Sequence, residues 1–166
     1  MVLRLILTRH AKSSWDDLRQ SDHDRPLNKR GRASAQAVGD WMRDQSFVPQ
    51  TILCSTAART RETLALLALD APVEFDEGLY HCSADTMRAK LTQQTAQAVL
   101  MVGHNPSIAE LAERLAHELP RHPRFLDYPT CATTVLEFDA DSWQEVQYGT
   151  GKIKAFVVPR ELSERT

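Results

Sequence analysis

The chain is 166 residues long and carries 20 Lys and Arg residues against 22 Asp and Glu residues, which leaves a net charge of −2 and excludes the basic surface typical of nucleic-acid-binding domains. A chain of this length can bury about 70% of the surface that its unfolded form exposes, so we expect residues 1–166 to form one domain. Its three cysteines, Cys54, Cys82 and Cys131, exclude a complete disulfide framework and favour a reducing compartment, so we expect a cytoplasmic protein.

Strands and helices are predicted to alternate along the chain. Short apolar runs bounded by polar residues indicate strands buried on both faces, whereas apolar residues spaced three and four apart indicate helices. In chain order these patterns predict a strand at 2–8, a helix at 28–45, a strand at 51–54, helices at 57–69 and 84–94, a strand at 97–102, a helix at 106–119, and strands at 132–138, 144–148 and 153–158.

Two of the predicted helices carry clear start signals. Asn28 is placed to cap the first, and Asn105 followed by Pro106 reads as the cap and first position of the other. The first helix places on one face the residues Ala33, Ala37, Val38, Trp41 and Met42. The second has the strongest periodicity of the chain, formed by Ile108, Leu111, Ala112, Leu115, Ala116 and Leu119.

This alternation predicts an α/β fold, specifically a three-layer α/β/α sandwich with a mostly parallel central sheet. In such sheets the ligand crevice lies outside the carboxyl ends of the strands. Polar residues follow three of the predicted strands: Arg9 and His10 after the first, Arg59 in the helix after the second, and His104 after the strand at 97–102. We expect these side chains to meet at one edge of the sheet.

Two guanidinium groups and two imidazoles form a set suited to a phosphate. Arginine makes bidentate hydrogen bonds to phosphoryl oxygens, and each bond to a charged group contributes about 1.5 to 3 kcal/mol. A neutral imidazole can attack a phosphoryl dianion without charge repulsion, so histidine is a suitable covalent catalyst. Cys54 also follows a strand and precedes Arg59, but four residues separate the two, whereas a cysteine phosphatase loop needs five.

The basic segment 25–32, "RPLNKRGR", has two interpretations. It directly follows the acidic stretch "DDLRQSDHD", which offsets much of its charge, so it can be the solvated start of a helix. Alternatively it forms a rim that attracts anionic substrates. The three tryptophans are interpreted as packing residues, although Trp15 is close enough to His10 in sequence to line an entrance.

Three motifs together resemble the histidine phosphatase superfamily, which includes the phosphoglycerate mutases: "TRHAKS" at 8–13, "CSTAARTRET" at 54–63 and "VGHNPS" at 102–107. Two further segments, "DRPLNKRG" at 24–31 and "FVVPREL" at 156–162, resemble its SixA-type phosphohistidine phosphatase branch. The resemblance extends from residue 3 to about residue 162. It implies a phosphoglycerate mutase-like fold.

The resemblance also implies roles for individual residues. His10 would be the nucleophile that forms a phosphohistidine intermediate, while Arg9, Arg59 and His104 would surround the phosphoryl group. Arg25 falls where the SixA-type branch places another phosphate-contacting arginine. The general acid stays open between Glu77, the adjacent Asp76 and no residue at all.

One position departs from the family pattern. The superfamily commonly has glycine after the nucleophile, whereas this chain has Ala11, so the backbone there must accommodate a Cβ atom.

The resulting functional expectation is a metal-independent phosphatase without a cofactor, acting on a protein-borne phosphohistidine. The alternatives are a phosphatase of small phosphoesters or nucleotides on the same site, or a non-catalytic module that binds a phosphorylated ligand. No carboxylate cluster suited to Mg²⁺ and no histidine pair with metalloprotease spacing occurs in the sequence, since His117 and His122 are five apart. No apolar run is long enough to cross a membrane, and a monomer is the default expectation.

Overall fold

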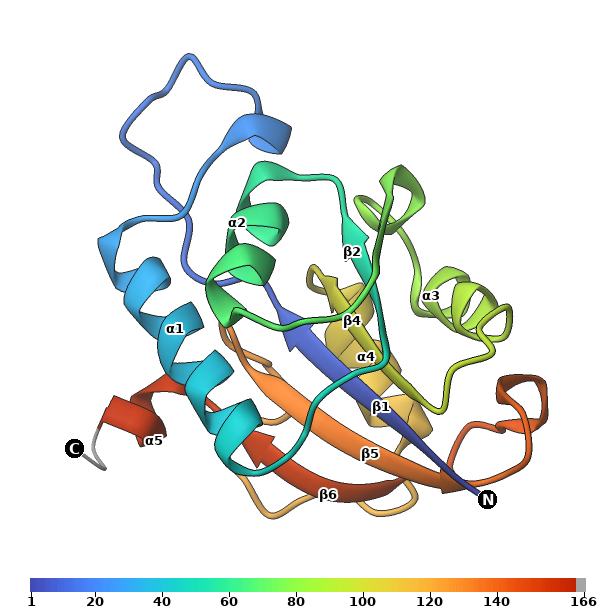
Figure 1. Cartoon of the computed structure of the whole chain (residues 1–166). Helices are drawn as coiled ribbons and strands as arrows, with labels where there is room; N and C mark the ends of the chain where they lie inside the picture. Colours follow the sequence, from blue (N-terminus) through green and yellow to red (C-terminus); the bar gives the residue numbers. More distant parts are fainter. Residues whose placement is uncertain (164–166) are drawn as a thin grey trace.

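A six-stranded sheet forms the centre of the computed structural model, which describes residues 1–163 (Figure 1). Its strands lie in the order β3, β2, β4, β1, β5, β6. The strands are β1 (Val2–Arg9), β2 (Thr51–Ser55), β3 (Val73–Asp76), β4 (Ala98–Gly103), β5 (Thr133–Asp139) and β6 (Lys152–Val157). Strands β3, β2, β4 and β1 run parallel to one another, whereas β5 pairs antiparallel with both β1 and β6. The predicted mostly parallel sheet is confirmed.

Helices cover both faces of this sheet, as the alternation of elements predicts. They are α1 (Lys29–Asp44), α2 (Ala58–Leu67), α3 (Ala84–Leu91), α4 (Ser107–Leu115) and α5 (Pro159–Ser163), with the short 3-10 helices η1 (Asp22–Asp24), η2 (Glu77–Leu79) and η3 (Trp143–Glu145). None of the helices formed by residues 1–163 is long and apolar enough to cross a membrane. The expected single domain at 1–166 includes 164–166, which lie outside the described residues.

The core is divided between the two faces because successive strand residues point in opposite directions. In β1, Leu5 and Leu7 belong to a cluster with residues of α3 and α4, whereas Ile6 belongs to a second cluster with α1 and α2. The same division separates Met101 from Val102 in β4. Burial on both faces explains why these strands read as continuous apolar runs.

Helix α1 largely follows its prediction. Asn28 caps it by accepting a hydrogen bond from the amide of Gly31 at 2.8 Å. The buried stripe differs from the predicted face: Ala33 is exposed, and the buried positions are Gly31, Ala35, Val38, Gly39 and Met42. The stripe includes glycine because α1 approaches the loop after β1 closely. A Cβ at Gly31 would lie 2.1 Å from the carbonyl oxygen of Lys12, so only glycine fits this contact.

Helix α4 departs from its predicted start and end. Asn105 does not cap it, because the Asn105 side-chain amide donates instead to the carbonyls of Asp127 and Tyr128, and the cap position is Pro106. The helix ends at Leu115 rather than at residue 119, since Ala116 leaves the helix to form a bridge with Gly151.

Two strand predictions need correction. The segment 144–148 is not a strand, because η3 and a turn occupy it; Trp143 in η3 and Val146 just after η3 belong to the core. Conversely, β3 was not predicted. It is an edge strand whose residues "VEFD" are exposed or half-buried, so it lacks the apolar run that marks the central strands.

Candidate active site

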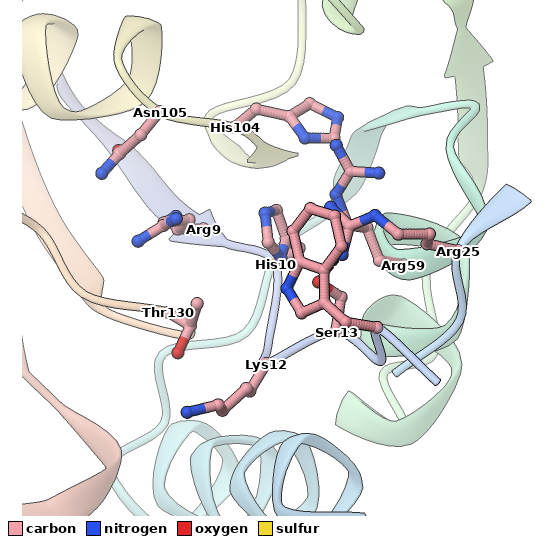
Figure 2. A pocket seen from close by; sticks show the side chains of 10 residues that line it. Arg9, His10, Lys12, Ser13, Arg25, Arg59, His104, Asn105 and Thr130 are labelled. Atoms are coloured by element: carbon pink, nitrogen blue, oxygen red, sulfur yellow. Dashed lines mark hydrogen bonds between the residues drawn. The ribbon is translucent and has the colours of Figure 1, made fainter. Parts of the chain in front are cut away.

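The predicted site residues other than Glu77 and Asp76 meet in one pocket at the carboxyl edge of the parallel strands (Figure 2). The pocket has a volume of about 340 Å³ and is lined by Arg9, His10, Lys12, Ser13, Trp15, Arg25, Arg59, His104, Asn105 and Thr130. The imidazoles of His10 and His104 lie with ring centroids 5.3 Å apart. Adjacent parallel strands bring them together, because Arg9 in β1 is in register with Gly103 in β4.

His10 is fixed through both its backbone and its ring. Its amide donates to the carbonyl of Gly103 at 3.0 Å, and its carbonyl accepts from the amide of Cys131 at 2.9 Å. The ring Nδ1 lies 2.7 Å from the carbonyl oxygen of Ala11. A carbonyl can only accept, so Nδ1 carries the proton and Nε2 keeps its lone pair. The ring therefore presents a nucleophilic nitrogen in a fixed orientation.

Burial is the main reason why the pKa of His10 falls to about 3, and the positive charge of Arg9 lowers it further. His10 is only 6% exposed. Near neutral pH its imidazole is therefore uncharged, which is the protonation state that can attack phosphorus.

Ala11 follows His10 at the position where the sequence pattern of the superfamily commonly has glycine, and the backbone of this structure accommodates its Cβ atom. Ala11 is buried in the cluster beneath α1 and α2, and its amide donates to Thr63 Oγ1 at 2.9 Å. Its backbone is not among the left-handed positions of the described chain. A methyl group at residue 11 is therefore part of the core and does not disturb the site.

Arg9 contributes a guanidinium whose charge is only partly compensated. Its Nη1 donates to the carbonyl of Tyr128 at 3.1 Å, while its buried Nε has no hydrogen-bond partner within the described protein. Burial lowers the pKa of Arg9, and the positive charge of Arg59 lowers it further. Two guanidinium groups that repel each other in a pocket favour a bound anion.

Asp22 joins Arg25 and Arg59, and sequence reasoning missed it. Its carboxylate accepts from Nη2 of Arg25 and from Nη2 of Arg59, each at 3.0 Å, and from the hydroxyl of Tyr80. Arg25 also donates to Ser13 Oγ. The hydrogen bond from Tyr80 and those from the two arginines hold the pKa of Asp22 well below its usual range. Asp22 is thus a permanent anion that orients two arginines.

His104 faces the pocket with an unpaired ring nitrogen. Ser55 Oγ accepts from the amide of Ala57 and lies 2.8 Å from His104 Nε2. No other acceptor for the Ser55 hydroxyl lies within the described residues, so we assign its proton to the bond with Nε2 and the ring proton to Nδ1. Burial first, and then the charge of Arg59, lower the pKa of His104 to about 3. Its buried Nδ1 has no partner in the described protein.

Unpaired polar atoms concentrate in this pocket. Residues 1–163 contain five buried side-chain nitrogen or oxygen atoms without a hydrogen-bond partner, and four of them belong to Arg9, Arg59, His104 and Asn105. Leaving a buried donor unpaired costs about 1 to 3 kcal/mol, so such atoms require an explanation. Three of them are nitrogen atoms of side chains that line the pocket, so the lining holds more hydrogen-bond donors than the described protein itself uses.

The structure does not bring Glu77 into the pocket. Glu77 is exposed at the start of η2 and is not among the lining residues. Asp76 is also occupied elsewhere, because it pairs with Lys90 Nζ at 2.6 Å and accepts from the amide of Gly78. Neither carboxylate is positioned to donate a proton to a group bound beside His10.

Cys54 cannot act as a nucleophile in this environment. It is fully buried in the sheet, and burial raises the pKa of its thiol to about 12. We therefore expect Cys54→Ser to retain phosphatase activity within about twofold. The kcat of the purified variant checks this, and a loss comparable to that of a His10 variant would restore the cysteine mechanism.

The two buried histidines predict that stability depends on pH. The folded-state pKa values near 3 lie below the unfolded value of about 6.5, so the unfolded chain binds more protons between these limits. The free energy of unfolding should therefore be highest above about pH 7 and decrease at acidic pH. Each histidine should contribute about 2 kcal/mol to the decrease between pH 7 and pH 5.

Chemical denaturation in phosphate-free buffer at pH 7 and pH 5 measures this loss. Between pH 7 and pH 5, the free energy of unfolding of His104→Asn should decrease less than that of the unmodified chain. His117→Asn, which changes an exposed histidine, should show the same decrease as the unmodified chain. An identical loss in all three proteins would contradict the assignment.

Comparison with known proteins agrees with this geometry. Residues 5–98 match the family model described as "Histidine phosphatase superfamily (branch 1)", a range that contains Arg9, His10, Arg25 and Arg59. An uncharacterized protein of Mycobacterium tuberculosis (strain H37Rv) is 35% identical over 159 residues, which cover 92% of this chain and 99% of that protein. The chain belongs to the histidine phosphatase superfamily.

Solved structures narrow the assignment within the superfamily. The candidate phosphohistidine phosphatase SixA of Nakamurella multipartitia superposes with a TM-score of 0.84 at 29% identity, covering 96% of this chain and 97% of that one. Its counterpart from Agrobacterium tumefaciens gives 0.79 at 28% identity, with 95% and 98% covered. The protein is therefore a phosphatase of the SixA-type branch with the phosphoglycerate mutase-like fold.

Proposed function

We propose that the protein hydrolyses phosphorylated substrates in two steps through a phosphohistidine on His10. In the first step the Nε2 lone pair attacks phosphorus, the bond between phosphorus and the leaving group breaks, and the leaving group departs with the electron pair. In the second step water attacks phosphorus, the P–N bond breaks, and inorganic phosphate leaves a regenerated imidazole. The neutral, oriented ring of His10 among cationic groups is the observation that carries this proposal.

The other polar groups of the pocket bind the phosphoryl oxygens in this proposal. Arg9, Arg59 and His104 contribute hydrogen-bond donors, and the buried Arg25 contributes further positive charge. Such preorganised donors stabilise the charge of the transition state without reorganising during the reaction. The same charges let the reaction proceed without a metal ion, so we expect activity to persist in a chelator.

A protein-borne phosphohistidine is the substrate that we propose. The names of the two SixA structures support it. The pocket supports it as well, because none of its lining residues is a carboxylic acid that could protonate an alkoxide. A phosphoimidazole does not require a general acid from the enzyme, since an imidazole that is protonated in solution is a good leaving group.

A second hollow next to the pocket also supports a protein substrate. It has a volume of about 520 Å³, shares Lys12 and Thr130 with the pocket, and includes Arg30 and Arg124 in its lining. The basic segment 25–32 is thus divided: Arg25 enters the pocket, Arg30 lines the adjoining hollow, and Arg32 pairs with Glu62. An acidic surface around a phosphohistidine would match this hollow.

The variant Arg30→Glu tests the role of this hollow. We expect it to lower kcat/KM for a phosphohistidine-bearing protein by about tenfold at low salt, with a smaller effect at high salt, because charge contacts outside the pocket mainly speed encounter. Turnover of phosphoramidate, which is too small to reach Arg30, should not change. An equal loss of kcat/KM on both substrates would mean that Arg30 contributes to folding or to the pocket itself, and not to binding of the protein substrate.

A substrate panel separates the proposal from its alternatives. Phosphohistidine proteins, sugar phosphates and nucleotides are compared by kcat/KM, with and without EDTA and with Glu77→Gln as a second enzyme. The proposal predicts the highest value for phosphohistidine, unaffected by EDTA or by Glu77→Gln. A preference for small phosphoesters, lowered by Glu77→Gln, would favour the phosphoester alternative, and binding without phosphate release would favour a non-catalytic module.

We further propose that residues 1–166 act as one monomeric domain in the cytoplasm. Three cysteines without disulfides, at residues 54, 82 and 131, support a reducing compartment.

A further inference from the structure

Trp15 is an exposed aromatic ring at the rim of a charged pocket. It is 69% exposed, yet it lines the same pocket as His10 and Arg59. It is also the only lining residue with a large apolar ring, since the others are cationic, small or polar. The interpretation of Trp15 as a packing residue is therefore wrong, and the alternative that it lines an entrance is confirmed.

The ring is held in place although it is exposed. The guanidinium of Arg25 lies over it, 3.7 Å from the ring centroid. Arg25 is itself buried and bound to Ser13 and Asp22. The chain beside the ring is also tied down, because the amide of Ser14 donates to the carbonyl of Pro26 at 2.8 Å. A ring stacked on a buried arginine loses little further freedom when a second ring binds.

The position of the Trp15 ring places it where the leaving group of the substrate can contact it. His10, Arg59 and His104 are buried residues of the pocket lining, so a phosphoryl group that they bind lies in the inner part of the pocket. In-line attack by His10 places the fourth substituent of phosphorus, which is the leaving group, on the side away from Nε2. Because a protein-borne leaving group is too large for the pocket, that substituent extends toward solvent past the exposed lining residues Lys12 and Trp15, of which only Trp15 carries a ring.

We propose that Trp15 forms a leaving-group subsite that selects phosphoryl groups attached to a flat aromatic ring, such as an imidazole. The inference rests on the proposed function of the His10 pocket and deepens it. Offset or edge-to-face contact between aromatic rings contributes beyond simple burial of area, enough for about a three- to tenfold preference. An alkyl leaving group gains no such contact.

A different role for Trp15 makes a distinct prediction. If the ring served only to hold Arg25 in place, its loss would weaken phosphoryl binding equally for every substrate. The test therefore compares two compounds that share a P–N bond and differ in the ring: phosphoimidazole and phosphoramidate.

We expect Trp15→Ala to lower kcat/KM for phosphoimidazole about three- to tenfold more than for phosphoramidate, and Trp15→Phe to restore most of the difference. Leu18→Ala, at another exposed residue of the same loop, should change neither value. An equal loss on both compounds, or no loss on either, would overturn the subsite.

A binding measurement keeps this test independent of the proposed function. Calorimetry compares phenylphosphonate with methylphosphonate, neither of which can be hydrolysed. The subsite predicts that Trp15→Ala weakens phenylphosphonate selectively, whether or not the enzyme prefers phosphohistidine. If Trp15→Ala and the unmodified chain bind phenylphosphonate with equal affinity, the subsite is refuted. If the substrate panel shows no preference for phosphohistidine, only the proposed substrate is refuted.

Discussion

Replacing His10 with asparagine should lower kcat by at least about a thousandfold, because the reaction loses its nucleophile. Asparagine is the sharpest substitution here. Its side-chain amide can still donate to the carbonyl of Ala11, as Nδ1 of His10 does at 2.7 Å, but nothing replaces Nε2. The variant should therefore fold and bind phosphate while failing to turn over substrate.

The measurement is steady-state turnover of phosphoramidate, with binding of inorganic phosphate as the control for an intact pocket. His117→Asn, at an exposed histidine outside the pocket, should keep full activity. Retention of more than about a tenth of the activity by His10→Asn would mean that another group attacks phosphorus.

Arg59→Ala should lower kcat/KM by about 10² to 10⁴, since under the proposed function it removes a guanidinium that makes charge-assisted hydrogen bonds to the phosphoryl group. The loss has a second cause. Arg59 also donates to the backbone carbonyl of Asp22 at 2.7 Å and to its carboxylate at 3.0 Å. Without Arg59, the carboxylate of Asp22 keeps its negative charge beside the pocket and repels an incoming phosphate.

Arg61 provides a matched control for this prediction. It lies two residues further along α2, is exposed, and has its guanidinium over the ring of Phe75 rather than in the pocket. Arg61→Ala should change kcat/KM less than twofold. Comparable losses for Arg59→Ala and Arg61→Ala would indicate that α2, and not the guanidinium of Arg59, is what the reaction requires.

The parallel core of the fold could be read from the sequence because burial on both faces leaves a simple pattern. β1, β2 and β4 are continuous apolar runs, and the polar residues that follow them necessarily share one edge. That rule alone brought Arg9, His10 and His104 together. The edge strand β3 and the turn at 144–148 escaped prediction because packing by neighbours, rather than local periodicity, determines their form.

The part of the site that sequence could not supply is its long-range polar network. Asp22 lies in an acidic stretch that is typical of a solvated loop, and only the fold places it against Arg59, 37 residues away. Glu77 shows the opposite case, since a carboxylate at a plausible sequence position lies outside the pocket. Tertiary contacts determine whether a carboxylate lies in the site, whereas the sheet topology already places the residues that directly follow the strands there.

The covalent intermediate is the central claim, and rapid quenching tests it most directly. Enzyme mixed with a ³²P-labelled phosphoramidate for milliseconds and quenched in alkali should carry label that is stable in alkali, labile in acid, and located on the peptide containing His10. Absence of label during active turnover, or label on any other residue, would contradict the account.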